Sequence, residues 1–224
     1  MKLGKGFYRT AAICAWASVI TTLCLIFLHY GFPAADSFEQ RVLLFQAPIY
    51  RFYLWSYFLH PFVALVSLIG IAAKLRFRTP SLAIFGVVFY GIWAFSEMLQ
   101  QALTLVAKNY GWRAAYLGTD TSAKASLSLY LNGFEAVSDA LYALIVFAFA
   151  LGSLLYGVAF WKGSLFEKLL AGFSFVYAVL SWLYFLGVFG WISIPSFIDN
   201  IYMAQPLNRA LLGYYLWKTD AEEG

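Results

Sequence analysis

Two ionisable residues lie in apolar stretches that are long enough to cross a lipid bilayer. Glu97 is in the third of these stretches and Arg209 is in the last. Ionisable groups in such positions are costly, so they are usually paired, turned towards a polar cavity, or functional. The structural interpretation is that Glu97 and Arg209 form a salt bridge or a buried polar network, or that the Arg209 side chain extends to the lipid–water interface. The alternative is that Glu97 accepts a proton or anchors a ligand. The sequence favours the structural interpretation, because no motif accompanies the acid.

Further polar residues recur at intervals of three or four, which puts each set on one face of its helix. Candidates for the same polar network or ligand site therefore come from the second, third, fourth and last apolar stretches: His60, Gln100, Glu135, Asp139 and Tyr202. Most of these residues lie towards the proposed outer end of their helices. We therefore expect a polar vestibule that opens to the outside, with Glu97 and Arg209 near its floor.

Two smaller groups of residues could bind metals or cofactors. Glu135 and Asp139 are one helical turn apart and could bind a cation or transfer protons, although hydrated acids near a helix start explain them more simply. His29 and His60 are the chain's two histidines and could ligate haem axially. His29 lies at the expected lipid–water boundary, however, whereas His60 lies about two turns inside. We therefore predict no cofactor and no metal site.

Composition identifies the environment of these residues. The chain has 224 residues, of which 62% are hydrophobic and only 12% are charged, against roughly a quarter in soluble proteins. A soluble domain of this size could not bury so much apolar surface, so the lipid bilayer is its expected partner. The net charge of +4 does not indicate nucleic-acid binding, because the lysines and arginines flank the apolar stretches.

We predict an all-α integral membrane protein, a bundle of six transmembrane helices in a single domain covering residues 1–224. The spans are expected near 9–30, 52–74, 81–107, 126–161, 168–190 and 200–217. The proposed inner segments carry nine lysines and arginines and the outer segments carry five, which favours two cytoplasmic termini. The fourth stretch is too long for one crossing and should project or tilt.

Two segments between the spans and one group of small residues within a span give three further predictions. Ser37 and Gln40 have the spacing of a capping box, which predicts a short interfacial helix over 37–47. Residues 108–125 are expected to form an irregular loop. In the fourth stretch, small residues are spaced for close backbone approach, within the chain or, less simply, between copies: Ala148, Gly152, Ser153 and Gly157.

Several segments from the third stretch onward, 95–98, 138–141, 162–168 and 211–218, form a pattern. They contain an acid in the third span (Glu97), an acid in a long fourth span (Asp139) and a short basic turn into the fifth. In this order of elements the chain resembles the bacterial membrane proteins grouped as domain of unknown function 4386. The resemblance implies a six-helix architecture in the bacterial inner membrane and implies no activity. Arg209 and the aromatic content of 21% depart from the pattern.

No catalytic signature is present in the sequence: it lacks the nucleophile elbow, the zinc-protease helix, the phosphate loop and the dinucleotide fingerprint. We therefore predict no catalytic residues and a non-enzymatic protein that binds or carries a small apolar or amphipathic molecule. The alternative is an accessory or structural subunit, packed against other membrane subunits. A third interpretation, an intramembrane enzyme or a haem-binding redox protein, would require a bound group at His60, Glu97 or Asp139.

Overall fold

The computed structural model describes residues 3–195 and 203–218, and this part of the chain is helical throughout, without strands. Five helices are long and apolar enough to cross a membrane: α1 (Lys5–Phe27), α3 (Pro48–Leu75), α4 (Pro80–Ala102), α6 (Thr121–Trp161) and α7 (Leu165–Val188). They correspond to the first five predicted spans. The described residues therefore form an all-helical membrane protein.

The last predicted span, 200–217, coincides only in part with a described helix. Helix α9 (Gln205–Trp217) has 13 residues. At 1.5 Å per residue it is about 20 Å long, which is shorter than a hydrocarbon core of about 30 Å. Helix α9 by itself therefore cannot cross the bilayer. Tyr202, a candidate site residue, lies outside the described residues.

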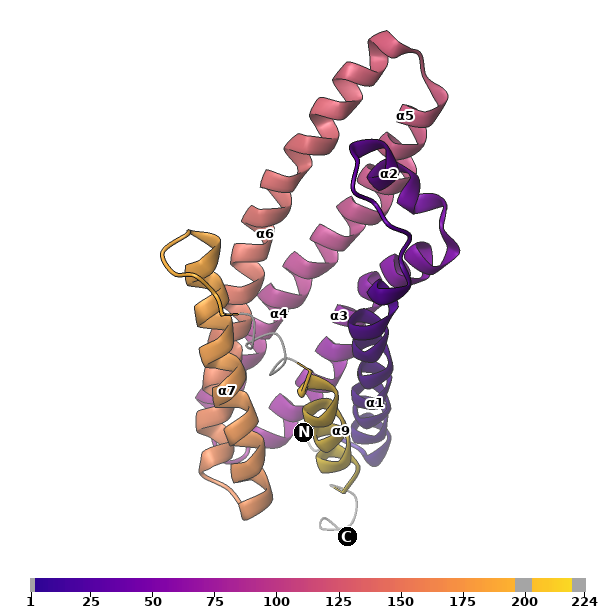
Figure 1. The fold of residues 1–224 in the computed structure, drawn as a ribbon. Coiled ribbons are helices and arrows are strands. Elements are labelled where there is room, and N and C mark those ends of the chain that lie inside the picture. Colours follow the sequence, from indigo (N-terminus) through magenta and orange to yellow (C-terminus); the bar gives the residue numbers. More distant parts are fainter. Residues whose placement is uncertain (1–2, 196–202, 219–224) are drawn as a thin grey trace.

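The long helices form a ring that α9 closes (Figure 1). Neighbours in contact are α7 with α6, α6 with α4, α4 with α3, and α3 with α1. Helix α9 packs mainly on α1 and also touches α3 and α7, so it fills the lower part of the space between the two ends of this row. Helix α1 begins and α9 ends at the same end of the bundle.

At the opposite end, α6 extends beyond the rest of the bundle (Figure 1). Its 41 residues give a length of about 60 Å, roughly twice the thickness of the hydrocarbon core. The prediction that the fourth stretch projects or tilts is confirmed. A small apolar cluster of Val42, Tyr116 and Leu131 joins α2 (Phe38–Leu43) and α5 (Ala114–Gly118) to this part of α6.

The predicted short helix over 37–47 is confirmed as α2 followed by a 3₁₀ turn, Leu44–Gln46. Its capping box is formed in both directions. The Gln40 amide donates to the Ser37 hydroxyl at 3.2 Å, and the Ser37 amide donates to Gln40 Oε1 at 2.9 Å. These bonds satisfy backbone groups that the helix start would otherwise leave unpaired.

The prediction of an irregular loop over 108–125 is wrong. The chain continues from α4 through wide π-helical turns, Leu103–Arg113, into α5, and α6 begins at Thr121. The reason lies in side chains that satisfy the wider turns: Asn109 Nδ2 donates to the Thr104 carbonyl at 2.6 Å, and Arg113 Nη1 donates to Asn109 Oδ1 at 2.7 Å. Asn109 thus supports the helix, although its residue type favours turns.

The small residues of α6 serve contacts within the chain, as predicted. A Cβ atom on Gly152 would come within 3.0 Å of the Tyr90 ring, and one on Gly157 within 2.7 Å of the Phe175 ring. The Tyr90 hydroxyl also lies 3.0 Å from Ser153 Oγ. The absence of side chains at these glycines therefore lets α4 and α7 pack closely against α6.

Candidate functional site

A cavity of about 330 Å³ lies inside the ring of helices, and we call it the inner cavity. Three candidate site residues line it: Glu97 of α4, Arg209 of α9 and His60 of α3. The remaining wall is largely aromatic and aliphatic, with Tyr53, Tyr57, Trp93, Tyr142, Ile145, Val146 and Phe149 among its residues. A mostly apolar cavity with a few convergent polar groups is typical of sites for small ligands.

The start of α9 lies at the wall of the inner cavity. Gln205, the first residue of the helix, and Arg209, one turn later, both line the cavity. Pro206 occupies the first turn, a position that tolerates proline because the first amides of a helix lack partners inside it. Among the described residues, no side chain caps this helix start with a hydrogen bond; the N-cap residue is Ala204. The positive end of the α9 dipole and the Arg209 guanidinium therefore act on the same space.

Glu97 and Arg209 are both buried, with 6% and 4% of their surfaces exposed. Within residues 3–195 and 203–218 no ion pair of 4.0 Å or less joins them. Trp93 contacts both: the Arg209 guanidinium carbon lies 5.9 Å from its ring centroid, and its indole interacts with the Glu97 carboxylate. The salt bridge expected on the structural interpretation is not formed. The acid and the base instead face one cavity separately.

The two histidines have different surroundings. His60 is buried, and its Nδ1 lies 2.8 Å from the Thr21 hydroxyl. His29 is exposed at the end of α1, where its ring lies 3.9 Å from the ring of Tyr30, and it does not line the inner cavity. Among the described residues, no group of three or more His, Cys, Asp or Glu side chains is arranged to hold a metal ion.

A second cavity, of about 310 Å³, adjoins the first, and we call it the outer cavity. The two share Tyr53, Tyr57 and Tyr142 in their walls, so these three side chains form the boundary between them. Gln100 and Asp139 line the outer cavity. The Gln100 amide is held in place because it donates to the Ser138 carbonyl at 2.8 Å and to the Ser138 hydroxyl at 3.0 Å.

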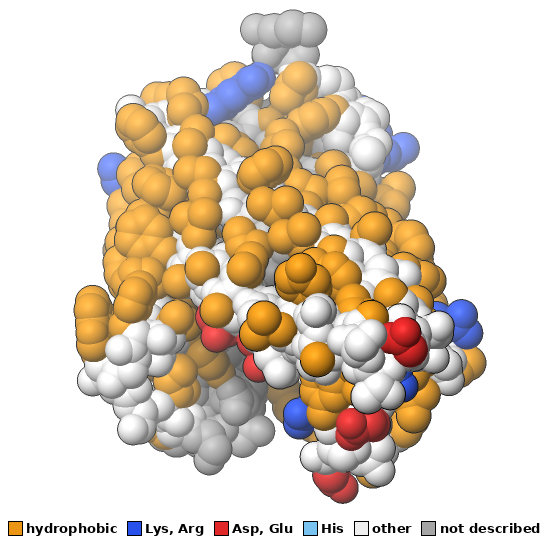
Figure 2. Space-filling model, turned by 90° about the horizontal axis from the view of Figure 1, so that it is seen from above, with side chains coloured by type: hydrophobic (Ala, Val, Ile, Leu, Met, Phe, Trp, Pro, Cys, Tyr) orange, Lys and Arg blue, Asp and Glu red, His pale blue; other side chains and the backbone are white. Residues whose placement is uncertain are grey.

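Glu135 is separated from this arrangement. It lines a space of only about 30 Å³, beside Arg41, Lys108 and Arg113. Glu135 and Asp139 are both exposed, as hydrated acids would be. Figure 2 looks onto the end of the molecule at which α2 and α5 lie and shows a recess there with acidic side chains at its edge. The structure thus divides the candidates between the inner cavity, the outer cavity and the surface.

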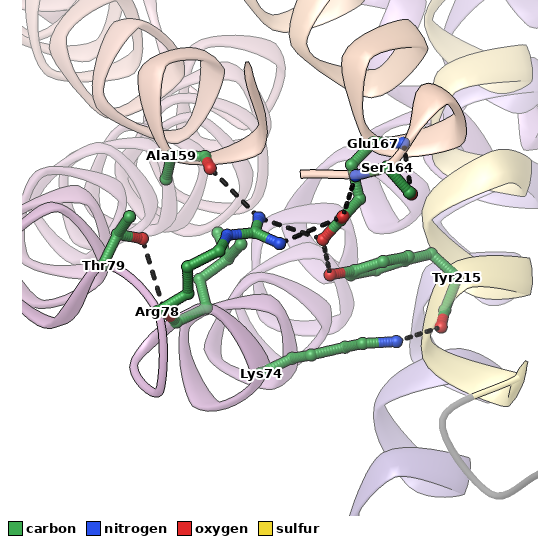
Figure 3. A network of polar contacts seen from close by, with 8 residues as sticks. Lys74, Arg78, Thr79, Ala159, Ser164, Glu167 and Tyr215 are labelled. Atoms are coloured by element: carbon green, nitrogen blue, oxygen red, sulfur yellow. Dashed lines mark hydrogen bonds and ion pairs between the residues drawn. The ribbon is translucent and has the colours of Figure 1, made fainter. Parts of the chain in front are cut away.

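A third polar group, which the sequence analysis missed, lies at the end of the bundle where α9 ends (Figure 3). Arg78 and Glu167 form a bidentate ion pair, with Nη1 to Oε2 at 3.1 Å and Nη2 to Oε1 at 3.0 Å. The Tyr215 hydroxyl donates to Glu167 Oε1 at 2.6 Å, and the Ser164 amide donates to Oε2 at 2.7 Å. We call these four residues the clasp.

The clasp joins three parts of the chain: the α3–α4 turn, the start of α7 and α9. Arg78 Nη2 also donates to the Ala159 carbonyl at the end of α6, and Lys74 Nζ donates to the Tyr215 carbonyl at 3.4 Å. Ser164 and Glu167 form a capping box, which is a recognisable sequence signal for the helix start. Nothing in the sequence points to Arg78 and Tyr215 as its partners.

No family model matches this chain, and no curated protein or solved structure is significantly similar to it.

Proposed function

We propose that the protein binds, and carries across or within the membrane, a small molecule that enters the inner cavity through the outer one. The observation that supports this most strongly is a buried acid and a buried base on different helices that line one cavity without forming an ion pair. Removing two charges from water costs several kcal/mol per ion, and a close pair is the usual compensation. A site that leaves both groups free to face an occupant is a site adapted for binding.

The walls of the two cavities support the same proposal. The inner cavity has a volume in the lower range of ligand sites, and its apolar wall would bury most of a small molecule. Tyr53, Tyr57 and Tyr142 lie where a molecule would pass from one cavity to the other. Tyrosine side chains can move aside by rotation about two torsion angles, so such a boundary can open without movement of the helices.

We also propose six crossings, with both termini in the cytoplasm of a bacterium. Helix α7 ends towards the end of the bundle at which α2 lies, whereas α9 ends at the opposite one (Figure 1), and this supports a sixth crossing. The nine lysines and arginines of the proposed inner segments favour placing the end with the clasp at the cytoplasmic face. The outer cavity then faces the periplasm.

Substituted cysteines test whether the inner cavity is open to water from outside. Ile145→Cys places a thiol in the cavity wall, and Leu154→Cys places one on the outer surface of the same helix, where lipid should cover it. Both variants are made with Cys14 and Cys24 replaced by serine. A membrane-impermeant methanethiosulfonate reagent is added to intact cells, and modification is measured by mass spectrometry.

We expect rapid modification of Ile145→Cys and little of Leu154→Cys. Modification of neither thiol from outside would contradict the proposed function. The accessory-subunit alternative would instead be supported by a stoichiometric partner chain that co-purifies in mild detergent and shields Ile145→Cys.

A further inference from the structure

The charges of the inner cavity indicate the chemical class of its occupant. Glu97 and Arg209 are each more than nine-tenths buried and line the same cavity. Within the described part of the chain, Arg209 makes no hydrogen bond and no ion pair; its guanidinium carbon lies 5.9 Å from the centroid of the Trp93 ring. A guanidinium carries five N–H donors, and buried donors without partners cost free energy. The structure therefore leaves an anion-binding group pointing into the cavity.

The start of α9 strengthens the preference for an anion at this side of the cavity. Its first residue, Gln205, lines the cavity one turn before Arg209, and the N-cap residue Ala204 provides no capping side chain. Amides of a first helical turn and the helix dipole together bind anionic groups such as carboxylates. A carboxylate that accepts a bidentate bond from Arg209 would also lie near these amides.

The surroundings of Glu97 favour a cation. Glu97 supplies a negative charge to the cavity, and aromatic residues line the same cavity: Tyr53, Tyr57, Trp93 and Tyr142. Aromatic faces attract ammonium groups, most strongly where water is excluded. An ammonium group in this position would also compensate the buried carboxylate, which has no basic partner within 4.0 Å among the described residues.

A ligand with one charge would compensate one of the two residues and leave the other buried alone. We propose, building on the function proposed above, that the inner cavity binds a zwitterion with an ammonium and a carboxylate group and a small apolar or aromatic body, as in an apolar α-amino acid. Its carboxylate would face Arg209 and the start of α9, and its ammonium would face Glu97. The apolar wall formed by Ile145, Val146 and Phe149 would receive its side chain.

Three probes that share one aromatic body separate the charges. Phenylalanine carries both groups, phenethylamine carries only the ammonium, and 3-phenylpropanoate carries only the carboxylate. Binding to the purified full-length protein is measured by isothermal titration calorimetry at neutral pH. We expect phenylalanine to bind roughly tenfold or more tightly than either singly charged probe, since each lost contact leaves a buried charge unpaired.

Isosteric variants assign each charge to its residue. In Glu97→Gln we expect the preference for phenylalanine over 3-phenylpropanoate to disappear, and in Arg209→Gln the preference over phenethylamine. Leu154→Val, on the outer surface of α6 and outside the cavity wall, serves as the control and should keep both preferences. The comparison of the three probes on the unaltered protein needs no variant, so it decides the proposal even where a variant does not fold.

The outcomes separate this inference from the proposed function. Equal binding of phenylalanine and a singly charged probe would overturn the zwitterion and leave a small-molecule site. Failure of all three probes, with Ile145→Cys still modified from outside, would overturn the amino-acid-like class alone. Failure of all three with no modification of Ile145→Cys would overturn both.

Discussion

Two acid–base sets in this bundle differ in how their charges are compensated. In the clasp, Arg78 and Glu167 form two hydrogen bonds of 3.0–3.1 Å, and Tyr215 and Ser164 satisfy the remaining acceptor positions. In the inner cavity, Glu97 and Arg209 are both buried, unlike the partly exposed Arg78, but make no ion pair with each other in the described part of the chain. Similar residue types thus serve two purposes.

The difference follows from what surrounds each set. The clasp holds the start of α7, the α3–α4 turn and α9 against one another, because the bonds from Arg78 and Tyr215 to Glu167 join segments far apart in the sequence. Breaking such a pair leaves a charge without compensation. Glu97 and Arg209 form no ion pair with each other in the described part of the chain, and both line the inner cavity. We infer that the clasp stabilises the fold, whereas Glu97 and Arg209 are available to a ligand.

The largest expected effect on stability comes from opening the clasp. Glu167→Gln removes the negative charge that Arg78 and Tyr215 contact, and we expect a loss of about 2–3 kcal/mol after allowance for the partly exposed Arg78. The midpoint of thermal unfolding in detergent measures it. Glu39→Gln, at an exposed acid of α2, is the matched control and should change the midpoint little. A Glu167→Gln protein as stable as this control would refute the structural role.

A smaller effect is expected when the clasp is displaced with all its charges retained. A Cβ atom on Gly163 would collide with the Glu167 carboxylate and come within 2.7 Å of Arg78 Nη1. Gly163→Ala should therefore cost about 1–2 kcal/mol, because the ion pair must shift. In Gly172→Ala the new methyl group meets open space, and stability should stay equal or rise. Thermal unfolding of the two variants side by side checks this, and equal midpoints would contradict it.

Several parts of this arrangement could be predicted from the sequence. The lengths of the apolar stretches predicted five helices close to their observed positions, and the spacing of Ser37 and Gln40 predicted the start of α2. Glycine spacing indicated where α6 packs closely. Each of these signals comes from residues close together in the sequence. None of them depends on which other helix is the packing partner. Helical faces also indicated which polar residues turn inward, and Glu97, Arg209 and His60 do line one cavity.

Pairing across the bundle could not be predicted in the same way. Periodicity shows which face of a helix is buried but not which helix lies against it, so Arg78 and Tyr215 gave no sign that they meet Glu167. For the same reason, periodicity could not show how far apart the Glu97 and Arg209 side chains lie, and the expected salt bridge between them is not formed. The incorrect prediction of a loop over 108–125 followed from turn formers such as Asn109 and Gly111; the bond from Asn109 to the Thr104 carbonyl reverses that preference.

The cavity pair should respond to substitution in the opposite way from the clasp. Glu97→Gln removes a buried charge that lacks an ion pair within the described residues, so we expect the unfolding free energy to change by less than about 1 kcal/mol, or to rise. Phenylalanine binding should weaken in the same variant to the level of 3-phenylpropanoate. Calorimetry with phenylalanine and thermal unfolding of one preparation separate these effects. A loss of stability as large as that of Glu167→Gln would show that Glu97 stabilises the fold as the clasp does.

The smallest effect is expected at an acid that is fully exposed. Asp120 caps α6 by accepting from the Ala123 amide at 3.2 Å, and this bond and the Ser122 hydroxyl hold the pKa of its carboxyl below its usual value. Because the pKa is lowered on folding, the cap is fully effective above the usual Asp range and is lost as pH falls through the lowered value.

Asp120→Ala should therefore speed hydrogen exchange in the first turns of α6 and nowhere else. Asp120→Asn keeps an acceptor at this position, so it should retain the protection at neutral pH and lose its dependence on pH. Faster exchange throughout α6 in the alanine variant would show that this end of the helix is not independent of the bundle.

Paired double-mutant cycles on thermal stability test the contrast between the two sets most directly. One cycle combines Arg78→Met with Glu167→Gln, and the other combines Arg209→Met with Glu97→Gln. We expect a coupling free energy of about 1–3 kcal/mol in the clasp and no more than half of that in the cavity pair. A coupling between Glu97 and Arg209 that equals or exceeds the one between Arg78 and Glu167 would contradict this account, since it would make the cavity pair a structural bridge.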